Sequence, residues 1–137
     1  MNISVYTDGG ASGNPGPAAS AFVIYDESGN EVACSSKPIG NTTNNTAEYT
    51  ALINALTYIQ SVLTSTNTVA SISVFSDSEL MVRQLTGVYK IKNEDIRRLA
   101  TKVKGLSEGI VAPITYHHIP REKNKRADSL VRAILYP

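Results

Sequence analysis

The chain has no tryptophan and only one cysteine, Cys34, among its 137 residues. A single cysteine cannot form an intramolecular disulfide, so the small disulfide-stabilised scaffolds of secreted proteins are excluded. We expect Cys34 to be a small core or strand residue. The sequence also lacks an apolar run of about 18 residues, and no charged segment followed by an apolar one stands at its start. We therefore expect a soluble cytoplasmic protein without a membrane partner.

What the chain does contain is typical of one globular domain. Hydrophobic residues make up 42% of the sequence, which is ordinary for a globular protein. The length is sufficient for a real core, and no internal repeat, low-complexity tract or linker divides it. We expect a single domain over residues 1–137 that acts as a monomer.

The net charge of +1 hides a division between the two parts of the chain. Residues 1–82 contain seven acidic residues and one basic residue, whereas residues 83–137 contain twelve basic and five acidic residues. Such a division indicates a basic surface for a polyanion beside an acidic focus. The alternative is that the segregation disappears once the chain folds.

Hydrophobic periodicity predicts five strands and four helices. The expected strands span residues 2–8, 19–26, 31–38, 68–77 and 112–119. The expected helices span residues 41–63, 78–87, 93–106 and 124–135. A glycine- and proline-rich segment, residues 9–18, is expected to be a loop. The order βββαβααβα, with short connections between the first three strands, predicts an α/β protein with a mixed sheet flanked by helices.

Two aspartates end predicted strands. Asp8 closes the first strand, and Asp77 closes the apolar strand 68–77. In open α/β sheets, ligands bind outside the carboxyl ends of the strands, so this placement suggests a site. For Asp77 alone, the role of N-cap for the next helix is an equally good explanation.

Two further carboxylates lie beside the apolar stripes of predicted helices. Glu48 precedes Leu52 by four residues and therefore shares the buried side of its helix. A favourable interaction with the helix dipole would explain its place in the first turn but not this orientation. Asp128 precedes Val131 by three residues and, taken alone, is also explained as a surface acid paired with a neighbouring base.

If these four acids meet, they repel one another and raise one another's pKa. A hard divalent cation resolves this repulsion, because Mg²⁺ takes oxygen ligands from a few carboxylates and from substrate phosphate. Two such ions can stabilise an in-line phosphoryl displacement. An acidic cluster beside a basic half of the chain therefore indicates metal-dependent chemistry on a phosphate ester.

Four segments resemble the motif blocks of type 1 ribonuclease H (ribonuclease HI) and occur in the family's order. They read YTDGGASGNPGPAA, TTNNTAEYTAL, SDSELMVRQL and HHIPREKNKRADSL. The resemblance implies the ribonuclease H-like fold, with a mixed five-stranded sheet of three antiparallel strands and two parallel additions. It also implies an endonuclease that hydrolyses the RNA strand of RNA/DNA hybrids with two metal ions. The products would carry 5′-phosphate and 3′-hydroxyl ends.

By position, the resemblance assigns the catalytic and metal-binding roles to five residues. They are the four carboxylates Asp8, Glu48, Asp77 and Asp128, and the catalytic histidine His118. The implied cofactor is Mg²⁺, two ions with substrate bound, with Mn²⁺ as an alternative. His118 would aid release of product or metal, or shuttle a proton. We expect the neighbouring His117 to point to the opposite face of its strand and to take no part.

Substrate contacts are implied by the same blocks. The GNPG and TTNN segments would lie in the minor groove of the hybrid, where 2′-hydroxyls distinguish RNA from DNA. The resemblance places Thr43 and Asn93 in a pocket for a phosphate of the DNA strand. The implied substrate-binding residues are Gly9, Asn14, Thr43, Asn44, Asn45, Asn93 and Arg121. Capping and turn formation are the alternative roles of these asparagines.

The chain departs from the best-known bacterial members, which carry a basic helical protrusion rich in tryptophan and lysine. Here only VYKIK, residues 88–92, occupies that place, and Glu79 replaces a common amide. The HIPREKN segment resembles a subgroup without the protrusion, in which Arg121 would help to hold substrate. We expect Tyr89, Lys90 and Lys92 to supply a remnant of the DNA-strand channel, and the basic residues of 121–126 to compensate.

Three alternatives stay open at this point. The chain could also cleave double-stranded RNA. It could be a non-catalytic domain that binds RNA/DNA hybrids or double-stranded RNA on the same fold. It could be a relative that nicks or integrates DNA. The four carboxylates argue against a pure binding domain, and the asparagine-rich loops favour a hybrid-directed nuclease.

Overall fold

The computed structural model describes residues 1–137, and its centre is one five-stranded sheet with the strand order β3-β2-β1-β4-β5. The strands are β1 (Asn2–Ala11), β2 (Gly16–Tyr25), β3 (Glu31–Thr42), β4 (Ser71–Ser76) and β5 (Ile114–His118). β1, β2 and β3 pair antiparallel, whereas β4 joins β1, and β5 joins β4, in parallel. The predicted mixed sheet is thereby confirmed.

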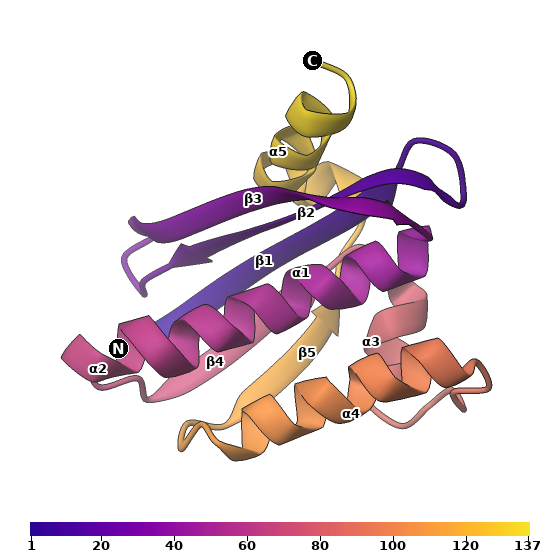
Figure 1. The fold of residues 1–137 in the computed structure, drawn as a ribbon. Helices are drawn as coiled ribbons and strands as arrows, with labels where there is room; N and C mark the ends of the chain where they lie inside the picture. Colours follow the sequence, from indigo (N-terminus) through magenta and orange to yellow (C-terminus); the bar gives the residue numbers. More distant parts are fainter.

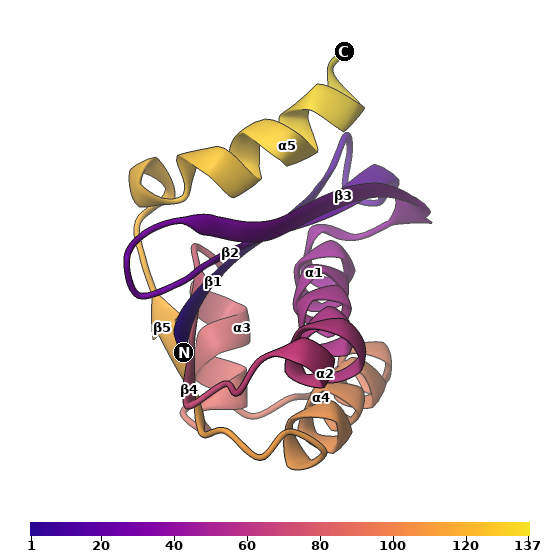
Figure 2. The ribbon, with the colours of Figure 1, turned by 90° about the vertical axis from the view of Figure 1, so that its left-hand side faces the viewer.

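The helices lie on both sides of this sheet (Figures 1 and 2). They are α1 (Asn44–Tyr58), continued by a π-helical turn η1 (Ile59–Leu63) and by α2 (Thr64–Thr66), then α3 (Glu79–Leu85), α4 (Glu94–Glu108), a 3₁₀ turn η2 (Arg121–Lys123) and α5 (Lys125–Leu135). Figure 2 shows α5 on one side of the sheet and α1 with α4 on the other. No helix is long and apolar enough to cross a membrane.

The main core lies between the sheet and α1. Alternate residues of β1, Ile3 and Val5, are buried against Leu52 and Leu56 of α1. Full burial of each such side chain contributes about 1.5–3 kcal/mol, so this layer provides most of the apolar stabilisation. The opposite face of the sheet carries a much smaller buried cluster, formed by Ala19, Ala21 and Val131.

The glycine-rich segment is more regular than its composition predicts. We expected a loop over residues 9–18, but β1 continues to Ala11 and β2 begins at Gly16. Pairing of Gly9 with Ser20 and of Gly10 with Ala19 continues the antiparallel ladder. The hydrogen bonds of this ladder override the weak strand preference of glycine. The loop prediction was therefore wrong outside residues 12–15.

Helix α1 also differs from its predicted range of 41–63. Its first turn begins at Asn44, because Thr43 is the N-cap and its hydroxyl accepts a hydrogen bond from the Thr46 N–H. Residues 41–42 belong to β3, and residues 59–63 form the π-helical turn. Cys34 lies in strand β3, and a strand was one of the two places expected for it. Its side chain is exposed and does not lie in the core.

Candidate active site

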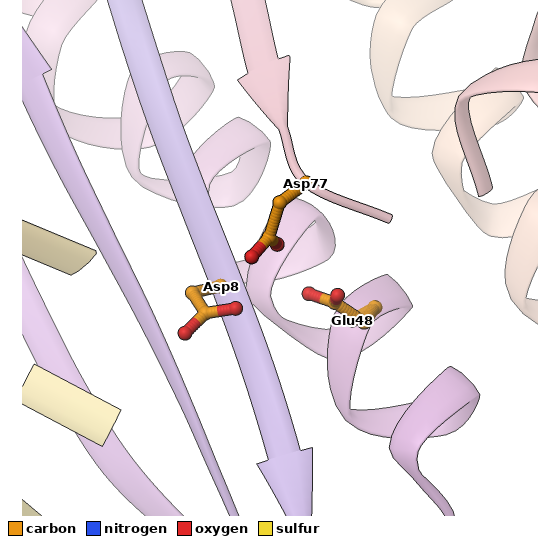
Figure 3. A group of neighbouring side chains, drawn as sticks. All are labelled: Asp8, Glu48 and Asp77. Atoms are coloured by element: carbon orange, nitrogen blue, oxygen red, sulfur yellow. The ribbon is translucent and has the colours of Figure 1, made fainter. Parts of the chain in front are cut away.

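The two strand-end aspartates lie on neighbouring parallel strands. Asp8 lies within β1, and Asp77 follows directly after β4. Thr7 pairs with Ser76 in the parallel ladder, so the residues that follow these two are adjacent. Figure 3 shows the carboxylates of Asp8 and Asp77 converging with that of Glu48 from α1. Ligand oxygens of these three residues all lie within 4.8 Å of one another.

Glu48 reaches this point because α1 and β1 approach closely. A Cβ atom at Gly9 would overlap the backbone of Ala47 and Glu48, so only glycine permits this packing. The Thr43 cap fixes the first turn of α1 just before the glutamate. Glu48 is only 9% exposed, which agrees with its predicted phase on the helix.

Burial makes the cluster electrostatically unfavourable as long as it contains only carboxylates. Burial and then the charges of Asp77 and Asp128 raise the pKa of Asp8 to about 8. Burial and the charges of Asp8 and Asp77 also raise the pKa of Glu48 well above its ordinary range. Oε1 of Glu48 and Oδ1 of Asp77 are buried without any hydrogen-bond partner. Unpaired buried oxygens are costly, so this arrangement suits a cation that would bind them.

Asp128 lies at the rim of the cluster, in the first turn of α5. Its side chain is 22% exposed, and its Oδ1 lies 3.4 Å from a guanidinium nitrogen of Arg121. The charge of Asp128 contributes to the raised pKa of Asp8, so the two carboxylates share one electrostatic environment. A cavity of about 420 Å³ contains all four predicted carboxylates together with Gly9, Asn44 and Arg121.

A second cavity, of about 450 Å³, gathers the remaining predicted substrate contacts. It is lined by Asn14, Thr43, Asn45 and Asn93, and Lys90 and Lys92 stand at the same cavity. Both lysines come from the short segment of residues 88–92, between α3 and α4.

The asparagines of these loops also maintain local structure. Oδ1 of Asn14 accepts the Asn44 N–H at 2.9 Å, and Oδ1 of Asn44 accepts the Ala11 N–H at 2.8 Å. Asn93 caps α4 by accepting the Ile96 N–H at 3.0 Å. In each case the amide oxygen is engaged and the amide N–H₂ group is left to donate. The capping role and a role toward an anion are therefore compatible in the same side chain.

The two histidines point to opposite faces of β5. The His117 ring stacks on Phe75, with centroids 5.1 Å apart, and lies 2.8 Å from the Thr115 hydroxyl. Nδ1 of His118 lies 3.8 Å from Oε2 of Glu79, and His118 does not line the carboxylate cavity. Glu79 also pairs with Arg83 at 3.5 Å. The sequence marked Glu79 as unusual but did not predict this contact with His118.

Two residues near α5 make contacts that were not anticipated from the sequence. Asn124 is buried, and its side chain donates to the Thr7 carbonyl oxygen at 2.8 Å, which ties the start of α5 to β1. An asparagine directly before a helix signals an N-cap, but here the side chain forms a long-range bond. Arg126 was expected to face substrate; instead its Nε lies 3.2 Å from Glu31 of β3.

A five-stranded mixed sheet with carboxylates converging from β1, β4 and α1 defines the ribonuclease H-like class of proteins. A family model described as reverse transcriptase-like matches residues 6–134. Together with the relatives described next, this match shows that the chain belongs to the ribonuclease H family.

The chain is 37% identical over 133 residues to ribonuclease HI of Halobacterium salinarum, covering 97% of this chain and 64% of that protein. It is 36% identical over 131 residues to the bifunctional protein Rv2228c of Mycobacterium tuberculosis, covering 95% of this chain and 34% of that protein. It thus spans less than two thirds of both curated relatives. The solved structure of LC11-RNase H1 in complex with RNA/DNA hybrid is similar with a TM-score of 0.90 and 47% identity, covering 96% of this chain and 94% of that chain.

Proposed function

We propose that the protein is an endonuclease that hydrolyses the RNA strand of RNA/DNA hybrids. The observation that carries this proposal is the convergence of three carboxylates, two of which have a buried oxygen without a partner. The solved complex of LC11-RNase H1 with an RNA/DNA hybrid supports the choice of substrate, because that protein and this chain are alike over nearly their whole lengths.

Asp8, Glu48 and Asp77 would hold one divalent cation, and Asp128 would complete a second site together with substrate phosphate. We propose Mg²⁺, two ions with substrate bound, with Mn²⁺ as an alternative. When bound, such ions stabilise the attacking and leaving oxygens of an in-line displacement. The donor set supports this assignment, because it consists only of carboxylate oxygens, the ligands that hard cations prefer.

In the proposed reaction, a water oxygen forms a bond to the scissile phosphorus, and the bond from phosphorus to the 3′ oxygen breaks. The water gives up a proton and the 3′ oxygen takes one up, so the products carry a 3′-hydroxyl and a 5′-phosphate. The chain's own carboxylates would position the reacting phosphate through the ions that they hold. Without a cation the pKa of Asp8 is raised to about 8, so binding of the ions at neutral pH would release a proton from this carboxyl. His118 would act at the rim, where it aids release of product or metal beside Glu79.

Substrate would be held by the two cavities together. Gly9, Asn44 and Arg121 line the carboxylate cavity, where the RNA strand would lie. Asn14, Thr43, Asn45 and Asn93 line the second cavity, where a phosphate of the DNA strand would meet amide donors. Lys90 and Lys92 supply the positive charge that the protrusion gives in other members. We propose that residues 1–137 act as one monomeric cytoplasmic domain, and the exposed free thiol of Cys34 suits a reducing compartment.

Cleavage of matched duplexes tests this proposal. RNA/DNA, RNA/RNA and DNA/DNA duplexes of one sequence are incubated with Mg²⁺, Mn²⁺ or a chelator. We expect cleavage of the hybrid's RNA strand only with metal. Asp8→Asn should lower the rate at least about a hundredfold. The exposed change Glu108→Gln, at the last residue of α4 and outside both cavities, should leave it unaltered.

Each other outcome of that assay has a definite meaning. Cutting that persists in chelator, or that Asp8→Asn leaves intact, would refute the metal site. Tight binding of hybrid without cleavage in either metal would establish the non-catalytic alternative. Equal cleavage of RNA/RNA would extend the substrate range to double-stranded RNA. Analysis of the product ends distinguishes a 5′-phosphate, which we expect, from a 3′-phosphate.

A further inference from the structure

A cavity of about 490 Å³ lies apart from the carboxylate site, on the face of the sheet opposite α1. Its floor is formed by Ser4, Tyr6 and Tyr25. Because β1 alternates, Ile3 and Val5 point into the main core while Ser4 and Tyr6 point to this other face. None of the residues that line this cavity lines the carboxylate cavity.

Helix α5 covers only part of this face, so aromatic rings remain accessible beside it. The Tyr6 ring meets Tyr25 edge to face, with centroids 5.6 Å apart, and stacks on Phe75 at 5.0 Å. Phe75 in turn stacks on His117. The row crosses β2, β1, β4 and β5 outside the main core. Aromatic rings at an open sheet face provide surfaces on which nucleic-acid bases stack.

The two walls of the cavity carry opposite charges. Asp26 and Glu27 belong to the β2–β3 turn, whereas Lys123 and Arg126 belong to η2 and α5. In Figure 2 this turn and the start of α5 lie on the same side of the molecule. A ligand that fits must therefore present hydrogen-bond donors to one wall and negative charge to the other.

The charged groups on both walls retain capacity for a ligand. Oδ1 of Asp26 accepts two N–H groups of its own turn, and Oε2 of Glu27 accepts the Asn2 N–H at 3.0 Å, which leaves further lone pairs on each carboxylate. Lys123 has no carboxylate within 4.0 Å. Arg126 is paired with Glu31, but the pair is about half exposed, and such pairs contribute little and can be exchanged.

We infer that this cavity binds a nucleotide with a single phosphate group. The base stacks on Tyr25 and meets Tyr6 edge to face, because the two rings are perpendicular. The sugar hydroxyls donate to Asp26 or Glu27, and the phosphate lies at Lys123 and Arg126. The volume is in the range of about 300–1,000 Å³ typical of small-ligand sites. A continuous strand is disfavoured, because its next phosphate would meet the acidic wall. The nucleotide is therefore a free nucleoside monophosphate, whose 3′ oxygen carries no further phosphate.

Titration with AMP and with adenosine, followed by amide NMR spectra of the full chain, tests this inference. A chelator is present throughout, so that metal-bridged binding at the carboxylate cluster cannot contribute. We expect saturable shifts at Ser4, Tyr6 and Gly29 with a dissociation constant on the order of 1 mM. We expect AMP to bind several-fold more tightly than adenosine. Shifts centred on Asp8 and Asp77, or no saturation, would overturn the proposal.

Two variants separate the contribution of the phosphate to binding from that of the base. Lys123→Ala, an exposed change that should not affect folding, should reduce the preference for AMP over adenosine, since only Arg126 would then face the phosphate. Tyr25→Ala should weaken both ligands about fivefold or more, since stacking is lost. Lys102→Ala, on α4 across the sheet, is the matched control and should change neither. An unchanged preference for AMP in Lys123→Ala refutes the phosphate assignment even if Tyr25→Ala fails to fold.

A 5′-phosphorylated trinucleotide tests whether the nucleotide must be free. We expect the trinucleotide to bind more weakly than AMP, and tighter binding would overturn the assignment of a free nucleotide. Neither result depends on hydrolysis, because this cavity and the carboxylate cluster share no residue. Loss of nuclease activity and loss of nucleotide binding can therefore be observed independently.

Discussion

Asp8 is predicted to lower the stability of the metal-free protein as pH rises. Its pKa is raised from 3.8 to about 8 in the folded chain. Between these values the folded protein keeps a proton that the unfolded chain releases, so the free energy of unfolding falls as pH rises. The slope for one such group is about 1.36 kcal/mol per pH unit. From pH 5.5 to pH 7.5, Asp8 should therefore cost about 2.7 kcal/mol.

Urea unfolding in chelator at these two pH values measures this loss. Asp8→Asn removes the ionisable group but keeps the shape of the side chain. Between pH 5.5 and pH 7.5 the variant should therefore lose less free energy of unfolding than the wild type, by up to about 2.7 kcal/mol. Glu48 has a raised pKa too and leaves a residual slope of the same sign in both proteins. Asp95→Asn, an exposed change on α4, should retain the full wild-type slope.

Divalent metal provides the second half of this test. Mg²⁺ binds the ionised cluster, so it should restore the wild type at pH 7.5 and have less effect on Asp8→Asn. If the free energy of unfolding in chelator changed equally with pH in the wild type and in Asp8→Asn, Asp8 would ionise without cost in the folded chain. The reasoning from burial and repulsion would then be refuted.

Further changes test other parts of the site. Gly9→Ala should destabilise the protein by about 1–3 kcal/mol in urea unfolding, because its methyl group overlaps the α1 backbone; Gly105→Ala, with open space around it, is the control. His118→Ala should lower turnover and largely keep hybrid affinity, and unchanged turnover would make His118 an ordinary surface residue. Replacing both Lys90 and Lys92 by alanine should raise KM and reduce the slope of log affinity against log salt by about 1 to 2. An unchanged slope would place the DNA strand elsewhere.

Much of the candidate site could be predicted because it follows from local rules. Asp8 and Asp77 were placed together by the ends of two strands, and Glu48 was placed by its phase on a helix. The resemblance added Asp128, which no periodicity would have distinguished from a surface acid. The structure brings all four to one cavity.

What could not be predicted depends on contacts between distant parts of the chain. The glycine segment reads locally as a loop, but pairing between β1 and β2 extends both strands through it. The bond from Asn124 to Thr7 spans 117 positions and has no local signature. The ion pair between Arg126 and Glu31 of β3 could not be predicted for the same reason, because these two residues come together only when the chain folds.

The four carboxylates do not rest on equally stable parts of the protein. Asp8, Glu48 and Asp77 lie on or beside elements of the 18-residue core, whereas Asp128 lies on α5, whose buried cluster has three residues. Local opening requires less free energy where less apolar surface is buried. Helix α5 should therefore open at denaturant concentrations that leave the sheet and α1 folded. The proposed enzyme would then lose its fourth carboxylate, and its activity, before it loses its fold.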